Sequence, residues 1–117
     1  MNYEEQPLVA AARKLLELRR LRLTFFKQSM FGEPAWDMLI TLYMDAYEGP
    51  LHSVTTICSH SGAPVSSALR WLAFLEHEEL VVRHDCPNDA RRVMVELSDR
   101  GRLIVTGFLE AALAHGL

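Results

Sequence analysis

Hydrophobic positions along the chain change period several times, and these changes divide the sequence into predicted elements. Residues 7–30 contain no internal glycine or proline and are rich in Ala, Leu, Arg and Lys, which predicts a long first helix. A second helix is predicted from Pro34 to Glu48, because its apolar residues recur three and four positions apart. These residues are Trp36, Leu39, Ile40, Tyr43 and Tyr47.

Two more helices are predicted on either side of Gly62. Ser53 is a good N-cap for the first, because its hydroxyl can accept hydrogen bonds from free backbone N–H groups. Gly62 supplies the positive φ of a sharp turn, and Pro64 suits the first turn of the next helix. The apolar face that we expect this helix to pack inward consists of Ala68, Leu72 and Leu75.

A β-hairpin is predicted next, because apolar residues then alternate with period two. They are Leu80 and Val82 in the first strand and Val93, Val95 and Leu97 in the second. We expect residues 51–52 to add a short third strand.

The last predicted helix begins after Ser98, a second N-cap residue, and runs to about His115. Gly101 lies in its first turn and is expected to weaken it slightly. The residues available for burial are Leu103, Ile104, Phe108, Leu109 and Leu113.

Two helices joined by a tight turn and followed by a hairpin make a winged helix-turn-helix. The predicted fold is mainly α with a small β-hairpin wing (α+β), with long N-terminal and C-terminal helices for dimerisation. We expect one domain over 1–117: a dimerisation helix at 7–30, a DNA-binding winged helix at 34–97 and a terminal helix at 98–117. The first helix carries two apolar stripes, which indicates two partners, its own core and another subunit.

Composition favours a globular protein. The chain has 117 residues, of which 50% are hydrophobic and 23% charged. Its start is acidic and does not resemble a secretory signal, and no apolar run approaches membrane-spanning length. The two cysteines, Cys58 and Cys86, fit no zinc spacing. We therefore expect a cytoplasmic protein with reduced thiols and no membrane partner.

The net charge of −3 is not that of a strongly basic nucleic-acid binder, but it is unevenly distributed. Residues 13–27 carry six basic side chains against Glu17 alone. From Pro64 to Arg102, six arginines face seven acidic residues. DNA binding must therefore come from the placement of a few arginines rather than from the overall field.

The second helix of the turn motif offers the first candidate DNA contacts. A recognition helix enters the major groove with its N-terminal part. Arg70 there can bind guanine or a phosphate through two hydrogen bonds, and serines can do either more weakly. The alternatives are first-turn capping for the serines and a solvated arginine paired with a nearby glutamate. The candidates are Val65, Ser66, Ser67 and Arg70.

The hairpin tip offers the second set of contacts. Pro87-Asn88-Asp89 is typical of a turn, and Arg91 and Arg92 follow it directly. A guanidinium at this place can reach a minor groove, and Asp89 can position Arg91 by a charge-assisted hydrogen bond. The pair can equally be a surface ion pair of little energetic value.

Residues 34–101 resemble the winged helix-turn-helix of the MarR family of bacterial transcriptional regulators. The stretch from Asp85 to Gly101 is close to that family's D-x-x-D-x-R…L-T-x-x-G wing, and Arg70 to Val81 follows its R-x-x-x-x-L-E-x-x-G-L-V pattern. The resemblance implies a homodimer on a pseudo-palindromic operator of double-stranded DNA, with Arg91 in the minor groove. It also implies a small-molecule effector site between the DNA-binding lobe and the dimerisation helices. Glu79 stands where the family prefers glycine.

Other chemistry finds little support. The five histidines lack ligand spacing, so we expect neither a metal site nor a cofactor. No nucleophile–base pair or phosphate loop is evident, so we do not expect an enzyme. Cys86 near three arginines leaves redox sensing open. Two alternative functions remain: a protein-interaction module with little DNA affinity, and a small-molecule sensor with an aromatic pocket from Trp36, Tyr43 and Phe25 or Phe26.

Overall fold

The computed structural model describes residues 7–23, 34–49 and 51–116. The end of the predicted first helix, residues 24–30, therefore lies outside the described residues. Five helices and three strands follow in the order α1 (Pro7–Leu23), α2 (Pro34–Glu48), β1 (His52–Ser53), α3 (Val54–His60), α4 (Val65–His77), β2 (Val81–Cys86), β3 (Asp89–Leu97) and α5 (Asp99–Ala114). Within these residues, no helix is both long enough and apolar enough to cross a membrane.

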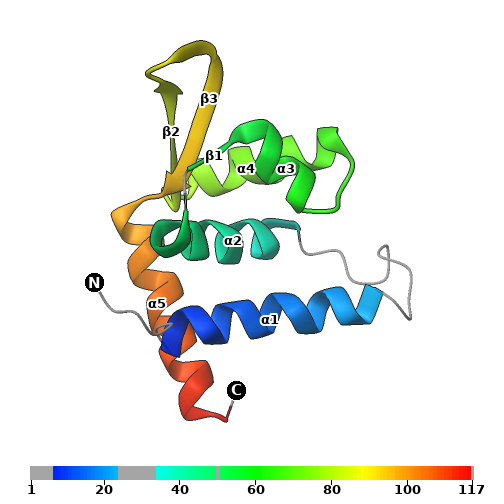
Figure 1. The fold of residues 1–117 in the computed structure, drawn as a ribbon, viewed down its shortest axis with the longest axis vertical. Coiled ribbons are helices and arrows are strands. Elements are labelled where there is room, and N and C mark those ends of the chain that lie inside the picture. The colour runs from blue at the N-terminus through cyan, green and yellow to red at the C-terminus, as the bar shows by residue number, and fades with distance from the viewer. Residues whose placement is uncertain (1–6, 24–33, 50, 117) are drawn as a thin grey trace.

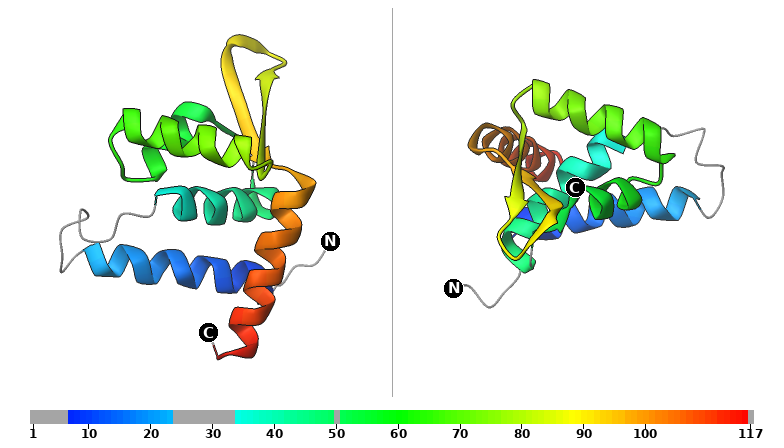
Figure 2. Two further views of the ribbon diagram at one scale, coloured as in Figure 1. Left: turned by 180° about the vertical axis from the view of Figure 1, so that it is seen from behind. Right: turned by 90° about the horizontal axis from the view of Figure 1, so that it is seen from above.

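Helix α2 is the centre of the helical layers. It lies between α1 on one side and the α3–α4 pair on the other, and it also contacts α5, which runs across the end of the layers (Figures 1 and 2). Two ion pairs join α1 to α2: Arg13 with Glu48 and Arg19 with Asp37. The wing, strands β2 and β3, projects away from α1 beside α3 and α4 (Figure 1).

The three strands form one antiparallel sheet in the order β1-β3-β2. The predicted third strand is present one residue later than expected, with Ser53 opposite Met94. The predicted face of β2 is wrong, because Val81 is buried while Val82 is 43% exposed. Pairing of Val81 with Leu97 sets this register, and a shift of one residue turns every side chain to the other face.

The predicted caps and turn are confirmed. The Ser53 hydroxyl accepts a hydrogen bond from the Thr56 backbone N–H at 3.2 Å, and the Ser98 hydroxyl accepts one from Gly101 at 2.9 Å. Gly62 has φ 75°. The N-cap of α4 is Pro64, one position ahead of the first helical turn. The predicted inward face of α4, Ala68, Leu72 and Leu75, is buried.

The predicted buried faces of α2 and α5 are partly wrong. In α2, Ile40 and Tyr43 are buried as expected, but Tyr47 is exposed and Met38 and Leu42 are buried instead. In α5 only Leu109 of the predicted set is buried, and Leu113 is half-buried. The core face of α5 consists of Gly101, Val105 and Leu109. Three residues that were predicted to be buried are therefore exposed: Leu103, Ile104 and Phe108.

Candidate nucleic-acid interface

Helix α4 presents a polar stripe away from the core. Ser66 and Arg70 are four residues apart, so they share the face opposite Ala68 and Leu72, and both are exposed. Val65 is 70% exposed at the first helical position, and Ser67 is half-buried on the flank. No cap from a side chain forms at the N-cap, Pro64. The predicted α4 residues therefore lie at the accessible N-terminal end of the helix.

At the wing tip, Asp89 orients the Arg91 side chain by hydrogen bonds. The Asp89 carboxylate accepts hydrogen bonds from the Arg91 backbone N–H at 3.0 Å, from Nε at 3.1 Å and from Nη2 at 3.4 Å. These hydrogen bonds hold the pKa of Asp89 below its usual value. The Arg91 side chain is nevertheless 91% exposed, so its orientation is restrained while its guanidinium stays open to a ligand.

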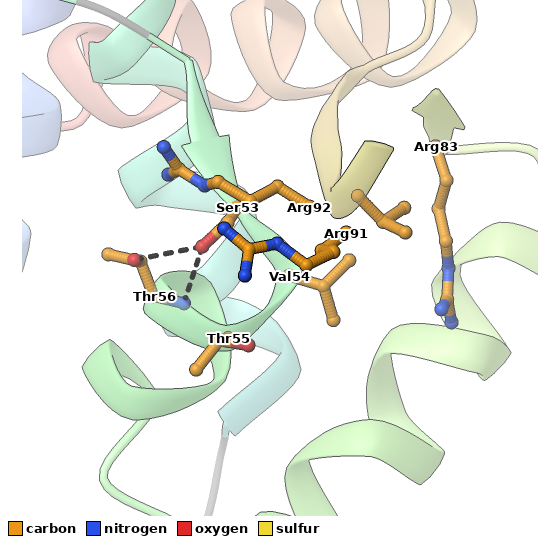
Figure 3. A pocket seen from close by; sticks show the side chains of 8 residues that line it. Ser53, Val54, Thr55, Thr56, Arg83, Arg91 and Arg92 are labelled. Atoms are coloured by element: carbon orange, nitrogen blue, oxygen red, sulfur yellow. Dashed lines mark hydrogen bonds between the residues drawn. The ribbon is translucent and has the colours of Figure 1, made fainter. Parts of the chain in front are cut away.

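A cleft of about 390 Å³ lies between the start of α3 and the wing. The side chains of Arg91 and Arg92 run from β3 across the start of α3, close to Ser53, while Arg83 runs from β2 toward α4 (Figure 3). The Arg92 side chain is exposed. The residues that line the cleft are Ser53, Val54, Thr55, Thr56, Arg83, Arg91, Arg92 and Val93. The cleft is therefore edged by three guanidinium groups and three hydroxyls.

Arg83 and the threonines were not among the predicted site residues. Arg83 lies two residues after the buried Val81, on the same face of β2, where it is opposite Val95. Its Nε lies 3.0 Å from a carboxylate oxygen of Glu76 on α4. This ion pair links α4 to the wing. Arg83 could have been found from the register of β2, because it lies on the same face as Val81. The sequence pattern instead assigned Val82 to the inward face, which is a shift of one residue.

The acidic residues of α4 gather at its C-terminal end. Glu76 is paired with Arg83, and Glu78 and Glu79 are exposed beyond it. The predicted DNA-contacting residues of α4 all precede them. Acidic side chains, which would repel DNA and so favour a protein-interaction module, are thus confined to one end of the helix.

Of the aromatic residues proposed for a sensor pocket, Tyr43 lies in the core and Trp36 is half-buried against it. Trp36 of α2 meets Phe108 of α5 edge-on, with ring centroids 4.9 Å apart, and Tyr43 is fully buried. Burial raises the pKa of the Tyr43 hydroxyl. Phe25 and Phe26 lie outside the described residues.

The remaining titratable side chains of the described residues are dispersed or paired with one another. No group of three or more potential ligands is found among residues 7–23, 34–49 and 51–116. His52 instead pairs with Asp45, whose pKa is raised by burial. Cys58 is buried, which raises the pKa of its thiol, and Cys86 is half-buried in the wing.

Several solved structures have the same fold. The Archaeoglobus fulgidus protein AF1382 is 20% identical with a TM-score of 0.60, and the match covers 84% of this chain and 98% of that one. The S. aureus MepR–DNA complex is 18% identical with a TM-score of 0.60, and the match covers 87% of this chain and 82% of that one. The transcriptional regulator PA4135 is 23% identical with a TM-score of 0.58, over 87% and 77%.

The similarity is one of structure rather than sequence. No protein-family model and no curated protein matches this sequence. The chain spans 64% of the length of a MepR mutant from a clinical isolate of S. aureus. Among these neighbours, PA4135 is a transcriptional regulator and one MepR structure is a complex with DNA. With five helices, a three-stranded sheet and a projecting hairpin among its described residues, this chain has the winged helix-turn-helix fold.

Proposed function

We propose that this protein is a MarR-like transcriptional regulator that binds double-stranded DNA as a homodimer on a pseudo-palindromic operator. The observation that carries the proposal is the cleft with Arg83, Arg91 and Arg92 at its edge, joined by the Glu76–Arg83 ion pair to the helix that presents Ser66 and Arg70. Regulation follows by competition, because an occupied operator changes the access of RNA polymerase to the promoter.

The two groups of residues have different roles in this proposal. Ser66, Ser67 and Arg70 contact base edges or phosphates of the major groove. Arg91 enters the adjacent minor groove with its guanidinium oriented by Asp89, and Arg92 contacts the backbone. The local concentration of guanidinium groups compensates for the net charge of −3.

The homodimer would form through α1 and α5. Helix α5 turns exposed Leu103 and Ile104 away from its core face, and Leu18 of α1 is 46% exposed. Apolar side chains of this size on two contacting helices favour a protein partner. A second copy of the chain fits the proposal, since two copies present two wings and two recognition helices to successive half-sites.

One observation favours a second candidate, a protein-interaction module. Trp71 and Phe74 of α4 are 41% and 50% exposed, and their rings meet edge-on with centroids 5.8 Å apart. Exposed aromatic residues are enriched at protein interfaces. They lie on the flank of α4 away from Val65 and Glu76, so a protein could occupy that flank.

The test is selection of bound sequences from random duplex DNA, followed by affinity measurements at several salt concentrations. We expect a selected site with two related half-sites. Arg91→Ala should weaken binding and lower the slope of log affinity against log salt by about one. Arg100→Ala, which removes an exposed arginine on α5, is the matched control and should leave both unchanged.

Two results would contradict the proposal in different ways. If no duplex is enriched, DNA is not the ligand and the protein-interaction module is favoured. If a site is enriched but Arg91→Ala behaves like Arg100→Ala, the protein binds DNA without the predicted wing contact.

A further inference from the structure

Helix α4 carries an apolar stripe that the predicted polar contacts do not explain. Val65 and Leu69 are four residues apart, and Glu76 follows seven residues later, so the three side chains leave the helix in nearly the same direction. Val65 is 70% exposed and Leu69 is 41% exposed. Ala73, also exposed, continues the stripe four residues after Leu69.

The partner of Glu76 shows which way this stripe faces. The Glu76 carboxylate lies 3.0 Å from Nε of Arg83 on β2, so Val65 and Leu69 are on the side of α4 that faces the wing. In Figure 3 the Arg83 side chain extends from β2 toward α4. Phe74 is nine residues from Val65, which places it on the opposite flank.

Guanidinium groups lie on both sides of the stripe. Arg70 is on the neighbouring outward face of α4, and Arg83 lies across the stripe on the wing. Arg83 is paired with Glu76, whereas Arg70 is an exposed cation beside the stripe, so a ligand that covers Val65 and Leu69 can carry anionic groups next to its apolar ones. The major groove has this character, because thymine C5-methyl groups lie between two rows of phosphates.

We propose that Val65 and Leu69 contact the C5-methyl groups of thymines in each half-site, beside the base or phosphate bound by Arg70. This inference rests on the proposed DNA-binding function and adds a sequence preference to it. The polar residues of α4 that precede its acidic end, Ser66, Ser67 and Arg70, can form few hydrogen bonds to bases, so methyl contacts would supply a large share of the discrimination.

The experiment replaces each thymine of the selected duplex, one at a time, with deoxyuridine. This change removes only the methyl group and keeps base pairing. With the unaltered protein, we expect about fourfold weaker binding at each contacted thymine, the fold-change for one buried methyl group. Other thymines should show no change.

Variants of the protein then assign each contact. Leu69→Ala should bind thymine and deoxyuridine equally at one of the sensitive positions, and Val65→Ala should do so at another. Phe74→Ala is the matched control, an exposed apolar residue on the opposite flank of the same helix, and should retain the full sensitivity. Both positions are exposed and alanine favours helix, so we expect the variants to fold.

Each failure has its own signature. A duplex that is bound with no sensitivity to any methyl group overturns this inference and leaves the proposed function intact. Sensitivity that is lost in Phe74→Ala instead of Leu69→Ala also overturns it, because the opposite flank would then face the bases. If no duplex is bound at all, both the inference and the proposed function fail, and the stripe belongs to a protein interface.

Discussion

A Cβ atom placed on Gly101 would lie 2.9 Å from the carbonyl carbon of Leu80 and closer still to the carbonyl oxygen. The same carbonyl accepts a hydrogen bond from the Ser98 backbone N–H at 3.0 Å. The first turn of α5 therefore packs directly against the backbone that leads into β2. Glycine is therefore required at position 101 for packing, a role that the sequence pattern did not predict.

Gly101→Ala should destabilise the protein by about 2–3 kcal/mol, because backbone atoms cannot move aside as a flexible side chain can. The matched control lies in the same helix: a Cβ on Gly107 meets nothing within 4 Å. Gly107→Ala should be neutral or stabilise by up to about 1 kcal/mol through helix propensity. Urea denaturation of both variants measures the difference, and equal stabilities would contradict the packing described here.

Glu79→Gly should stabilise the protein by about 0.5–1 kcal/mol. Glu79 has φ 62°, and the backbone N–H groups of Glu79 and Leu80 donate to the carbonyls of Glu76 and Leu75, which forms a Schellman motif. Relief of the left-handed strain outweighs the extra entropy of glycine. Glu78→Gly is the control, since Glu78 has φ −78°, and it should destabilise. Thermal melts of the two variants should therefore shift in opposite directions.

Much of the fold could be predicted because its signals are local. Ser53 and Ser98 are caps whose hydroxyls act within three residues along the chain, and Gly62 supplies the positive φ of the predicted turn. The buried face of α4, Ala68, Leu72 and Leu75, was also predicted from its spacing of four and three residues, although further apolar side chains lie exposed on this helix. These features depend on short-range geometry that the sequence states directly.

The predictions are wrong where contacts with residues distant in sequence determine which side chains are buried. Either Val81 or Val82 could face inward from the sequence alone, and it is the pairing of β2 with β3 that buries Val81. Helix α5 has apolar residues around most of its circumference. Its buried face includes Gly101, and glycine has no side chain that a hydrophobic pattern could register. The cleft at Arg83 was missed for the same reason, because it depends on the register of β2 and on its contact with Glu76.

The two cysteines should differ in reactivity toward a thiol reagent. Cys58 is buried and its thiol pKa is raised by burial, so little thiolate is present at pH 7–8. Cys86 is half-buried in the wing. We expect alkylation of the native protein at Cys86 first, with Cys58 labelled only after denaturation, as measured by mass spectrometry of the digested protein. Rapid labelling of Cys58 would show that α3 opens readily.

The Asp89–Arg91 contact should set a pH limit at the wing. Because hydrogen bonds from Arg91 lower the pKa of Asp89, the contact is at full strength above the ordinary pKa of about 3.9 and is lost as the pH falls through the lower folded value. NMR titration of the Asp89 carboxyl should give a value below the ordinary one. Arg91→Ala should raise that value, and an unchanged titration would mean that the contact does not persist in solution.

Leu103→Glu should shift the proposed dimer toward monomer without unfolding the chain, because the Leu103 side chain is 76% exposed within one subunit. Burying a carboxylate in an apolar interface is costly unless it is paired. Sedimentation velocity over a range of concentrations measures the change, and an unchanged melting temperature of the dilute protein confirms the fold. A variant that remains dimeric would place the subunit contact elsewhere.

The Ser98 side chain has a mechanical consequence. Its hydroxyl donates to the Glu79 carbonyl at 2.6 Å and accepts from Gly101, so one residue clamps the exit of α4 to the entry of α5. These two hydrogen bonds join the end of α4 directly to the start of α5. In the proposed dimer on DNA, a tilt of α5 would therefore be passed to α4 and would change the distance between the two half-sites that the α4 helices can reach.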